Sequence, residues 1–123
     1  MTRNEFEKYI CDTYGVEADF PWRNSPTNAV FRHAIGKKWF ALVMDLKRSQ
    51  IGGVVDETIA VVNLKCPTML ISSFCRDKGI YPAYHMSKAN WISVAIEEAD
   101  EEQLKALLDM SFNLTMTKPP RAK

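Results

Sequence analysis

The first fifteen residues carry apolar positions at the period of a helix. Phe6, Tyr9 and Ile10 stand at positions i, i+3 and i+4, which puts their side chains on one side of a helix. This spacing predicts an amphipathic helix over residues 3–14. Gly15 follows directly, and we expect it to end the helix because glycine adopts left-handed dihedral angles without a steric penalty.

The chain then runs through a turn-rich connection, with Phe20 and Trp22 as apolar anchors, into strand-like segments. Residues 29–35 and 38–46 flank Gly36, and their spacing predicts a tight β-hairpin. Within the second segment every second residue is large and apolar, and at this period these residues share one face of a strand. They are Phe40, Leu42, Met44 and Leu46.

The same two-residue period predicts two further strands. Residues 59–66 are rich in β-branched side chains, and residues 91–96 alternate large apolar residues with others, so each predicts a strand. The polar stretch around Gly52-Gly53 predicts a hairpin tip, or wing, that projects into solvent. We expect residues 80–90 to be irregular.

Two more helices are predicted from their starting residues. Pro67 suits the first position of a helix, and the apolar stripe that follows predicts a helix ending near Gly79. Asp100 with Gln103 resembles a capping box and predicts the start of a final helix. The pattern leaves open whether residues 111–116 prolong this helix or form a short one of their own.

The predicted order is helix, three strands, helix, strand, helix. This order is typical of an α+β domain with an antiparallel sheet and helices packed on one face. If side chains alternate through each strand, one sheet face is uniformly apolar and lies under the helices, while the other is mixed. The mixed face would carry Arg32, Trp39, Asn63, Lys65, Trp91 and Ser93.

Several short motifs occur in a set order along nearly the whole chain. They are Pro21-Trp22, Val30-Phe31-Arg32, Gly36 to Ala41, Asn63 to Cys66, Pro82 to Lys88, Asn90-Trp91 and Ser111-Phe112. In this combination the chain resembles the MmcQ/YjbR family, and the part from Lys65 through Lys88 to Trp91 is the most specific. The resemblance implies a small bacterial cytosolic protein with a CyaY-like (frataxin-like) α+β fold that binds DNA through a double-wing arrangement.

Composition agrees with a single globular domain. Of the 123 residues, 46% are hydrophobic and 25% are charged. We expect one YjbR-like domain over residues 1–117 and a disordered tail over residues 118–123.

The longest apolar run, Trp39 to Met44, is much shorter than the roughly 20 residues of a membrane span. Three widely spaced cysteines and the absence of a secretory leader predict reduced thiols and a cytoplasmic location.

Charge is unevenly distributed although the net charge is only +1. Residues 23–94 contain ten basic and four acidic side chains, whereas residues 1–22 and 95–117 together contain three basic and eleven acidic ones. If both acidic segments are helices on one side of the sheet, the sheet presents a positive face. The alternative is that solubilising charges simply fall in this order.

Cationic and aromatic side chains interleave along this basic middle. Lysine and arginine bind phosphates, and indole rings stack on bases for about 1–3 kcal/mol each. We therefore expect non-specific DNA binding, with phosphate contacts from a basic sheet face and aromatic stacking. The candidate interface consists of Arg32, Lys37, Lys38, Trp39, Lys65, His85, Lys88 and Trp91.

Other interpretations stay open for these residues. Trp39 and Trp91 belong to the core instead if the wing or the 79–90 loop covers them, and His85 could simply cap its loop. The chain could also be a protein-interaction adaptor, or could bind a small ligand or anion under that loop. His33 lies in a strand with apolar neighbours, so we expect a buried, hydrogen-bonded histidine and not a ligand.

The sequence lacks signatures of catalysis and metal binding. It contains no GxSxG, HExxH, P-loop or GxGxxG motif. Two histidines and three scattered cysteines do not have the spacing of a zinc site. We expect a non-enzymatic binding module with no cofactor, no metal and no membrane partner.

Overall fold

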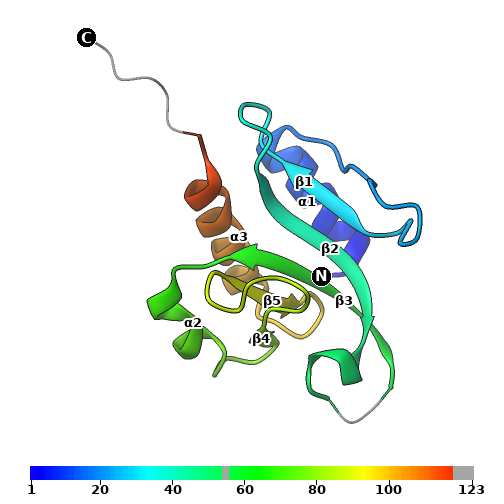
Figure 1. Cartoon of the computed structure of the whole chain (residues 1–123), viewed down its shortest axis with the longest axis vertical. Coiled ribbons are helices and arrows are strands. Elements are labelled where there is room, and N and C mark those ends of the chain that lie inside the picture. The colour runs from blue at the N-terminus through cyan, green and yellow to red at the C-terminus, as the bar shows by residue number, and fades with distance from the viewer. Residues whose placement is uncertain (54–55, 118–123) are drawn as a thin grey trace.

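The computed structural model describes residues 1–53 and 56–117, which form three α-helices, one 3₁₀ helix and a five-stranded sheet. In chain order the elements are α1 (Arg3–Tyr14), β1 (Ala29–Arg32), β2 (Trp39–Lys47), η1 (Arg48–Ile51), β3 (Thr58–Lys65), α2 (Thr68–Phe74), β4 (Ile80–Pro82), β5 (Trp91–Ala95) and α3 (Glu101–Thr115). The sheet is antiparallel with the order β1-β2-β3-β5-β4. Helices α1 and α3 cross the same face of it (Figure 1). The α+β prediction is confirmed.

Helix α1 has the predicted bounds because both of its ends are capped. Thr2 accepts a hydrogen bond from the Glu5 backbone, and the Glu5 side chain accepts one from the Thr2 backbone, which makes a complete capping box. At the other end Gly15 has φ of 67° and its N–H donates to the Cys11 carbonyl. Phe6 and Ile10 carry the buried side of the helix, as their spacing predicts.

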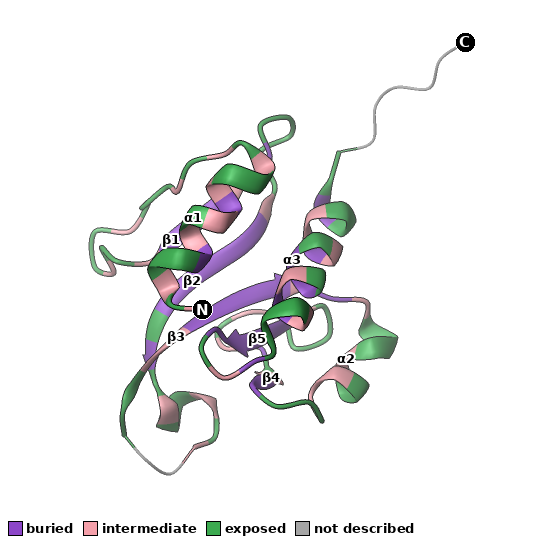
Figure 2. Ribbon diagram, turned by 180° about the vertical axis from the view of Figure 1, so that it is seen from behind, coloured by how far each residue is buried: buried purple, intermediate pink, exposed green. Residues whose placement is uncertain are grey.

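The main core lies between α1, α3 and the helix-facing side of the sheet, where buried residues gather in Figure 2. Phe6 of α1 and Leu104 and Leu108 of α3 pack there against Phe40 and Val43 of β2. Helix α3 is continuous through Thr115, so residues 111–115 prolong it. Its N-cap is Asp100, which accepts a hydrogen bond from the Gln103 backbone as expected.

Strand β2 corrects the predicted division of residues between the two faces. Phe31 pairs with Ala41 while Arg32 pairs with Trp39, so Phe40 is an extra residue, a β-bulge. Phe40 and Ala41 both face the helices, and the alternation restarts one residue later than expected. The prediction that Leu42, Met44 and Leu46 share the helix-facing side with Phe40 is therefore wrong. They pack together on the opposite face, which we call the open face.

Two other sequence predictions need correction near the sheet edge. Residues 80–90 are not wholly irregular, because β4 pairs with β5 as an edge strand. Pro82 argues against a strand when only the sequence is considered, although an edge strand tolerates a proline. The helix after Pro67 ends at Phe74 and not near Gly79. Gly79 has φ of 83°, and a Cβ there would lie 2.7 Å from the Ala99 nitrogen, so this turn requires glycine.

The connection between β2 and β3 is a hairpin, and its first half folds back over the sheet. Arg48 pairs with Glu57 at 2.7 Å and also with Glu98, which lowers the pKa of the Glu98 carboxyl. Ile51 packs on the apolar cluster of the open face, whereas Ser49 is exposed. The described part of the predicted wing thus lies partly against the sheet. Residues 54–55 of the wing and the predicted tail over 118–123 lie outside the described residues.

Candidate nucleic-acid interface and an adjoining groove

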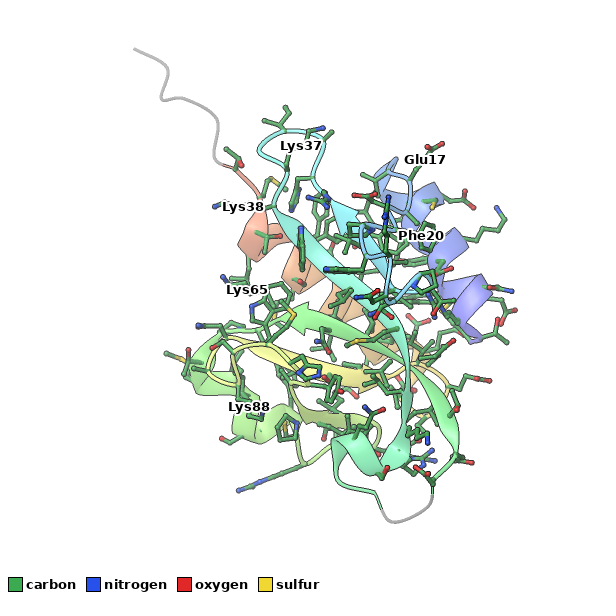
Figure 3. The ribbon with its side chains drawn as sticks, turned by 45° about the vertical axis from the view of Figure 1, so that its right-hand side comes forward. Glu17, Phe20, Lys37, Lys38, Lys65 and Lys88 are labelled. Carbon is green, nitrogen blue, oxygen red and sulfur yellow. The ribbon has the colours of Figure 1, made fainter. Side chains whose placement is uncertain are left out.

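Strand register brings Lys37, Lys38 and Lys65 to one end of the sheet, and Lys88 stands in the loop that leads into β5. Lys37 and Lys38 stand in the β1–β2 turn, and Lys65 ends β3. Lys65 pairs with Trp91, the first residue of β5, and Lys88 lies three residues before that tryptophan. Figure 3 shows the four lysines along one side of the molecule. We call Lys37, Lys38, Lys65 and Lys88 the lysine edge.

The lysine edge has no carboxylate partners in the part of the chain that the structure describes. Other lysines do have them: Lys8 pairs with Asp12 at 2.6 Å and Lys105 pairs with Glu101 at 3.2 Å. Those pairs lie on α1 and α3, which cover the helix-facing side of the sheet. The charge asymmetry of the sequence therefore becomes a spatial one, with solvated positive charge at the sheet end.

Arg32 differs from these lysines because its charge is neutralised by an ion pair. Its guanidinium lies 2.9 Å from the Asp19 carboxylate, and its central carbon lies 5.6 Å from the centroid of the Trp39 ring. Trp39 in turn meets Trp22 edge to face, with ring centroids 5.4 Å apart. Both indoles are half-buried. Arg32 and Trp39 thus belong to a packed group with Trp22 and Asp19.

Trp91 lies at the lysine edge itself. It is half-buried, and the Lys65 ammonium stands 5.9 Å from its ring centroid, a cation–π arrangement. The Lys65 backbone N–H donates to the Ser111 hydroxyl at 2.8 Å, and that hydroxyl donates to the Phe40 carbonyl at 2.6 Å. Ser111, which sequence reasoning missed, thereby joins the end of β3 to α3 and β2.

His85 lies in the loop between β4 and β5, three residues before Lys88 of the lysine edge. Its backbone has φ of 57°, a left-handed conformation that few non-glycine residues adopt, and its ring centroid stands 3.9 Å from that of Tyr84. His85 is exposed. The predicted site residues are therefore divided between the lysine edge, the Arg32–Trp39 group and this loop.

A buried polar network holds that loop against the sheet. The Asn63 amide donates to the Tyr84 carbonyl at 2.8 Å, and the Tyr84 N–H donates to the Ser93 hydroxyl at 2.9 Å. The Ser93 hydroxyl donates back to Asn63 at 2.5 Å, and both polar side chains are 0% exposed. Gln50 of η1 adds a bond to the Tyr84 hydroxyl at 2.8 Å. The signal in the sequence was an asparagine and a serine within two apolar strands.

The loop, η1, β2 and the connection after α1 enclose a groove of about 710 Å³ on the open face. Its floor is the apolar row of β2, and its walls include both indoles of the Arg32–Trp39 group. The lining residues are Trp22, Ser25, Asn28, Trp39, Leu42, Met44, Asp45, Leu46, Gln50, Tyr84, His85, Met86 and Ser87. Sequence reasoning placed Leu42, Met44 and Leu46 on the other face because it did not foresee the β2 bulge, which turns this apolar row toward the groove.

The remaining titratable candidates fill structural positions. His33 is buried as predicted, and its Nε2 lies 2.8 Å from the Thr115 hydroxyl. Burial lowers the pKa of His33. Burial raises the pKa of the Cys66 and Cys75 thiols, so both favour the protonated form over the nucleophilic thiolate. Within residues 1–53 and 56–117 no three His, Cys, Asp or Glu side chains gather as metal ligands.

Membrane insertion finds no support among the described helices. The longest, α3, has fifteen residues, and none of the helices in the described ranges has the length and apolar character that crossing a bilayer requires.

Comparison with known proteins gives concordant matches. A Bacillus subtilis (strain 168) protein named "Uncharacterized protein YyaQ" is 35% identical over 116 residues, covering 94% of this chain and 98% of that protein. A crystal structure of a Pseudomonas syringae protein is 38% identical, with a TM-score of 0.92 over 94% of this chain and 100% of that one. A Deinococcus radiodurans protein with a DUF419 domain shares the fold, with 21% identity and a TM-score of 0.63 over 92% of this chain and 77% of that one. The YjbR family model matches residues 12–114, and the chain belongs to the YjbR family.

Proposed function

We propose that this protein is a non-enzymatic DNA-binding module whose lysine edge contacts backbone phosphates without sequence preference. The observation that carries the proposal is the set of four lysines from three separate segments along one side of the molecule. No carboxylate neutralises them within the described ranges. The bacterial cytoplasm is the expected setting, and the three free cysteines support it because that compartment keeps thiols reduced.

The charge balance supports weak and salt-sensitive binding. The net charge is only +1, so attraction to DNA comes from the local edge and not from the molecule as a whole. The acidic helices α1 and α3 repel phosphate from the helix-facing side. A phosphate contact to duplex DNA changes the slope of log K against log salt by about −0.9, so removing two lysines reduces that slope by about 2.

The aromatic residues have unequal parts in this proposal. Trp91 stands beside Lys65 at the edge, so its exposed portion is available to a base or a sugar. Trp39 is held by Trp22 and Arg32 and contributes less stacking. Arg32 is paired with Asp19 and acts on DNA only if that pair opens.

The test is fluorescence anisotropy of short labelled single- and double-stranded DNA at low and physiological salt. The Lys65→Ala/Lys88→Ala chain should bind all sequences more weakly and with a flatter salt dependence. Lys8→Ala/Lys78→Ala is the matched control. It removes the same charge from positions close to carboxylates, since Lys8 pairs with Asp12 and Lys78 borders a hollow with Asp77 and Asp100.

Comparing the DNA affinities of the two double variants distinguishes the effect of the lysine edge from the effect of total charge. Equal losses in both would mean that total charge, and not the lysine edge, governs binding. Absence of wild-type binding at low salt would overturn the proposal.

A further inference from the structure

The groove on the open face differs in chemistry from the lysine edge. No lysine or arginine lines it. The single carboxylate in its lining, Asp45, is already paired with Arg3 at 3.0 Å. Its volume of about 710 Å³ falls within the range of about 300–1,000 Å³ that small-molecule sites have. The groove therefore has the size of a ligand site and no free charge among its described lining residues.

The lining is suited to a flat apolar molecule. Leu42, Met44 and Leu46 form the floor, and each is buried by its neighbours. Trp22 and Trp39 present two indoles at right angles, with an interplanar angle of 87°. With Met44 below and Met86 in the opposite loop, the groove combines indoles with thioethers, both of which interact favourably with aromatic rings.

The polar side chain of His85, at the rim, packs against the Tyr84 ring but has no hydrogen-bond partner among the described residues. The His85 imidazole makes no hydrogen bond to any described residue, although its backbone is held in a left-handed conformation. The preceding residue, Tyr84, is tied down through its N–H, its carbonyl and its hydroxyl. Such constrained positions cluster where a side chain is aimed at a ligand. His85 can donate to or accept from a heteroatom at the groove mouth.

We propose that the groove binds an uncharged bicyclic aromatic heterocycle, with its rings against Trp22, Trp39 and Met86 and a heteroatom bonded to His85. An acid or a phosphate ester is excluded from the proposal because no cation in the lining would balance it. The groove adjoins the lysine edge, since Ser87 precedes Lys88, but none of the four lysines lines it, so this inference does not depend on DNA binding.

The six methionines of the chain allow a direct test. Methyl-labelled methionine places probes at Met44 and Met86 in the groove, and at Met69, which is 86% exposed on α2, as an internal control. Three small probes are titrated: quinoline, its anionic size analogue 2-naphthoate, and the uncharged aliphatic 1-octanol. Quinoline should shift the Met44 and Met86 signals saturably, leave Met69 unchanged, and bind several-fold more tightly than the other two.

Two variants localise the binding. Trp22→Ala removes one indole. It should weaken the binding of quinoline at least about fivefold, which is the fold-change equivalent of one aromatic contact. His85→Gly introduces a residue that accepts the positive φ and removes the whole side chain with its imidazole, so quinoline should bind more weakly to a folded chain. Met69→Ala, on the exposed side of α2, should bind like the wild type.

Several results would overturn the proposal. One is the absence of saturable shifts at Met44 and Met86 with quinoline, and another is equal or tighter binding of 2-naphthoate or 1-octanol. If Trp22→Ala fails to fold, an unchanged affinity of His85→Gly for quinoline is enough to contradict the proposal. Oligothymidylate is titrated as a fourth probe, and if it alone shifts the two methionines, the groove is a base pocket of the DNA surface and not a small-molecule site.

Discussion

The two faces of the sheet bury apolar side chains under covers of different kinds. On the helix-facing side, α1 and α3 bring their own backbone hydrogen bonds and pack Phe6, Ile10 and Leu104 against the strands. On the open face, the row from Leu42 to Leu46 is covered by loops and by η1. A loop has no internal ladder of hydrogen bonds, so it must be attached to the sheet by specific polar contacts.

The difference explains the position of two buried polar residues. Asn63 and Ser93 are buried on the open face, where they bond the backbone of Tyr84. A cover held by a few hydrogen bonds opens at lower free energy than a packed helix does. The loop-covered face is therefore the one that can admit a ligand, and the helix-covered face supplies stability.

The largest effect is expected when one apolar residue is replaced on each face. Leu104→Ala should lower the free energy of unfolding by about 3–5 kcal/mol, because the helix-facing core cannot close the cavity. Met44→Ala should cost nearer to about 2 kcal/mol, because loops can collapse onto the gap. Urea denaturation measures both, with Met69→Ala as the exposed control. Equal costs would mean that the two covers are equally rigid.

A smaller effect is expected when the loop attachment is cut. Asn63→Ala leaves the Tyr84 carbonyl and the Ser93 hydroxyl without their partner and should cost about 1–3 kcal/mol. Hydrogen exchange should show a faster Tyr84 N–H while amides of α1 keep their protection. Asn113→Ala is the matched control, since Asn113 makes an exposed bond to Asp109. Uniform acceleration of α1 and the loop would contradict a loop-specific role for Asn63.

The smallest effect is a pH dependence on the helix-facing side. Burial lowers the pKa of His33 below its ordinary value of 6.5, so the unfolded chain binds a proton that the folded chain resists. The stability contributed by neutral His33 is complete above pH 6.5 and is lost as pH falls below it. Denaturation midpoints at pH 7.5 and pH 5.5 should differ less in His33→Asn than in the wild type. An unchanged difference would assign the pH dependence to other groups.

Local elements were predictable because their signals lie within a few residues. The i, i+3, i+4 spacing of α1 and the Asp100 cap of α3 involve neighbours in sequence, and both helices formed where expected. The hairpin of β1 and β2 was also predicted, although β1 ends at Arg32 and not at Ile35 as expected. The three-residue β4 was not, because so short a strand has no period to detect.

The candidate site was predictable in its residues and not in its arrangement. Lys37, Lys38, Lys65 and Lys88 could be read from the sequence, yet the common location of the first three follows from the pairing of β2 with β3, and Lys88 is placed by the loop before β5. A ligand site under the Tyr84 to Lys88 loop was one interpretation of the sequence, but the apolar floor of the groove could not be foreseen. One bulged residue at Phe40 reverses the facing of every later residue in β2, and no local pattern marks a bulge.

By itself the sequence determined the helices, the main strands, the basic middle of the chain and the resemblance to the YjbR family, because each depends on residue types at short or ordered spacings. The tertiary structure alone decided which face each β2 residue takes, that Arg32 is neutralised by Asp19, and that Trp22 meets Trp39. Those outcomes depend on strand register and on hydrogen bonds such as Asn63 to Tyr84, which join residues twenty-one positions apart. Contacts of that range are set by the packing of the whole domain.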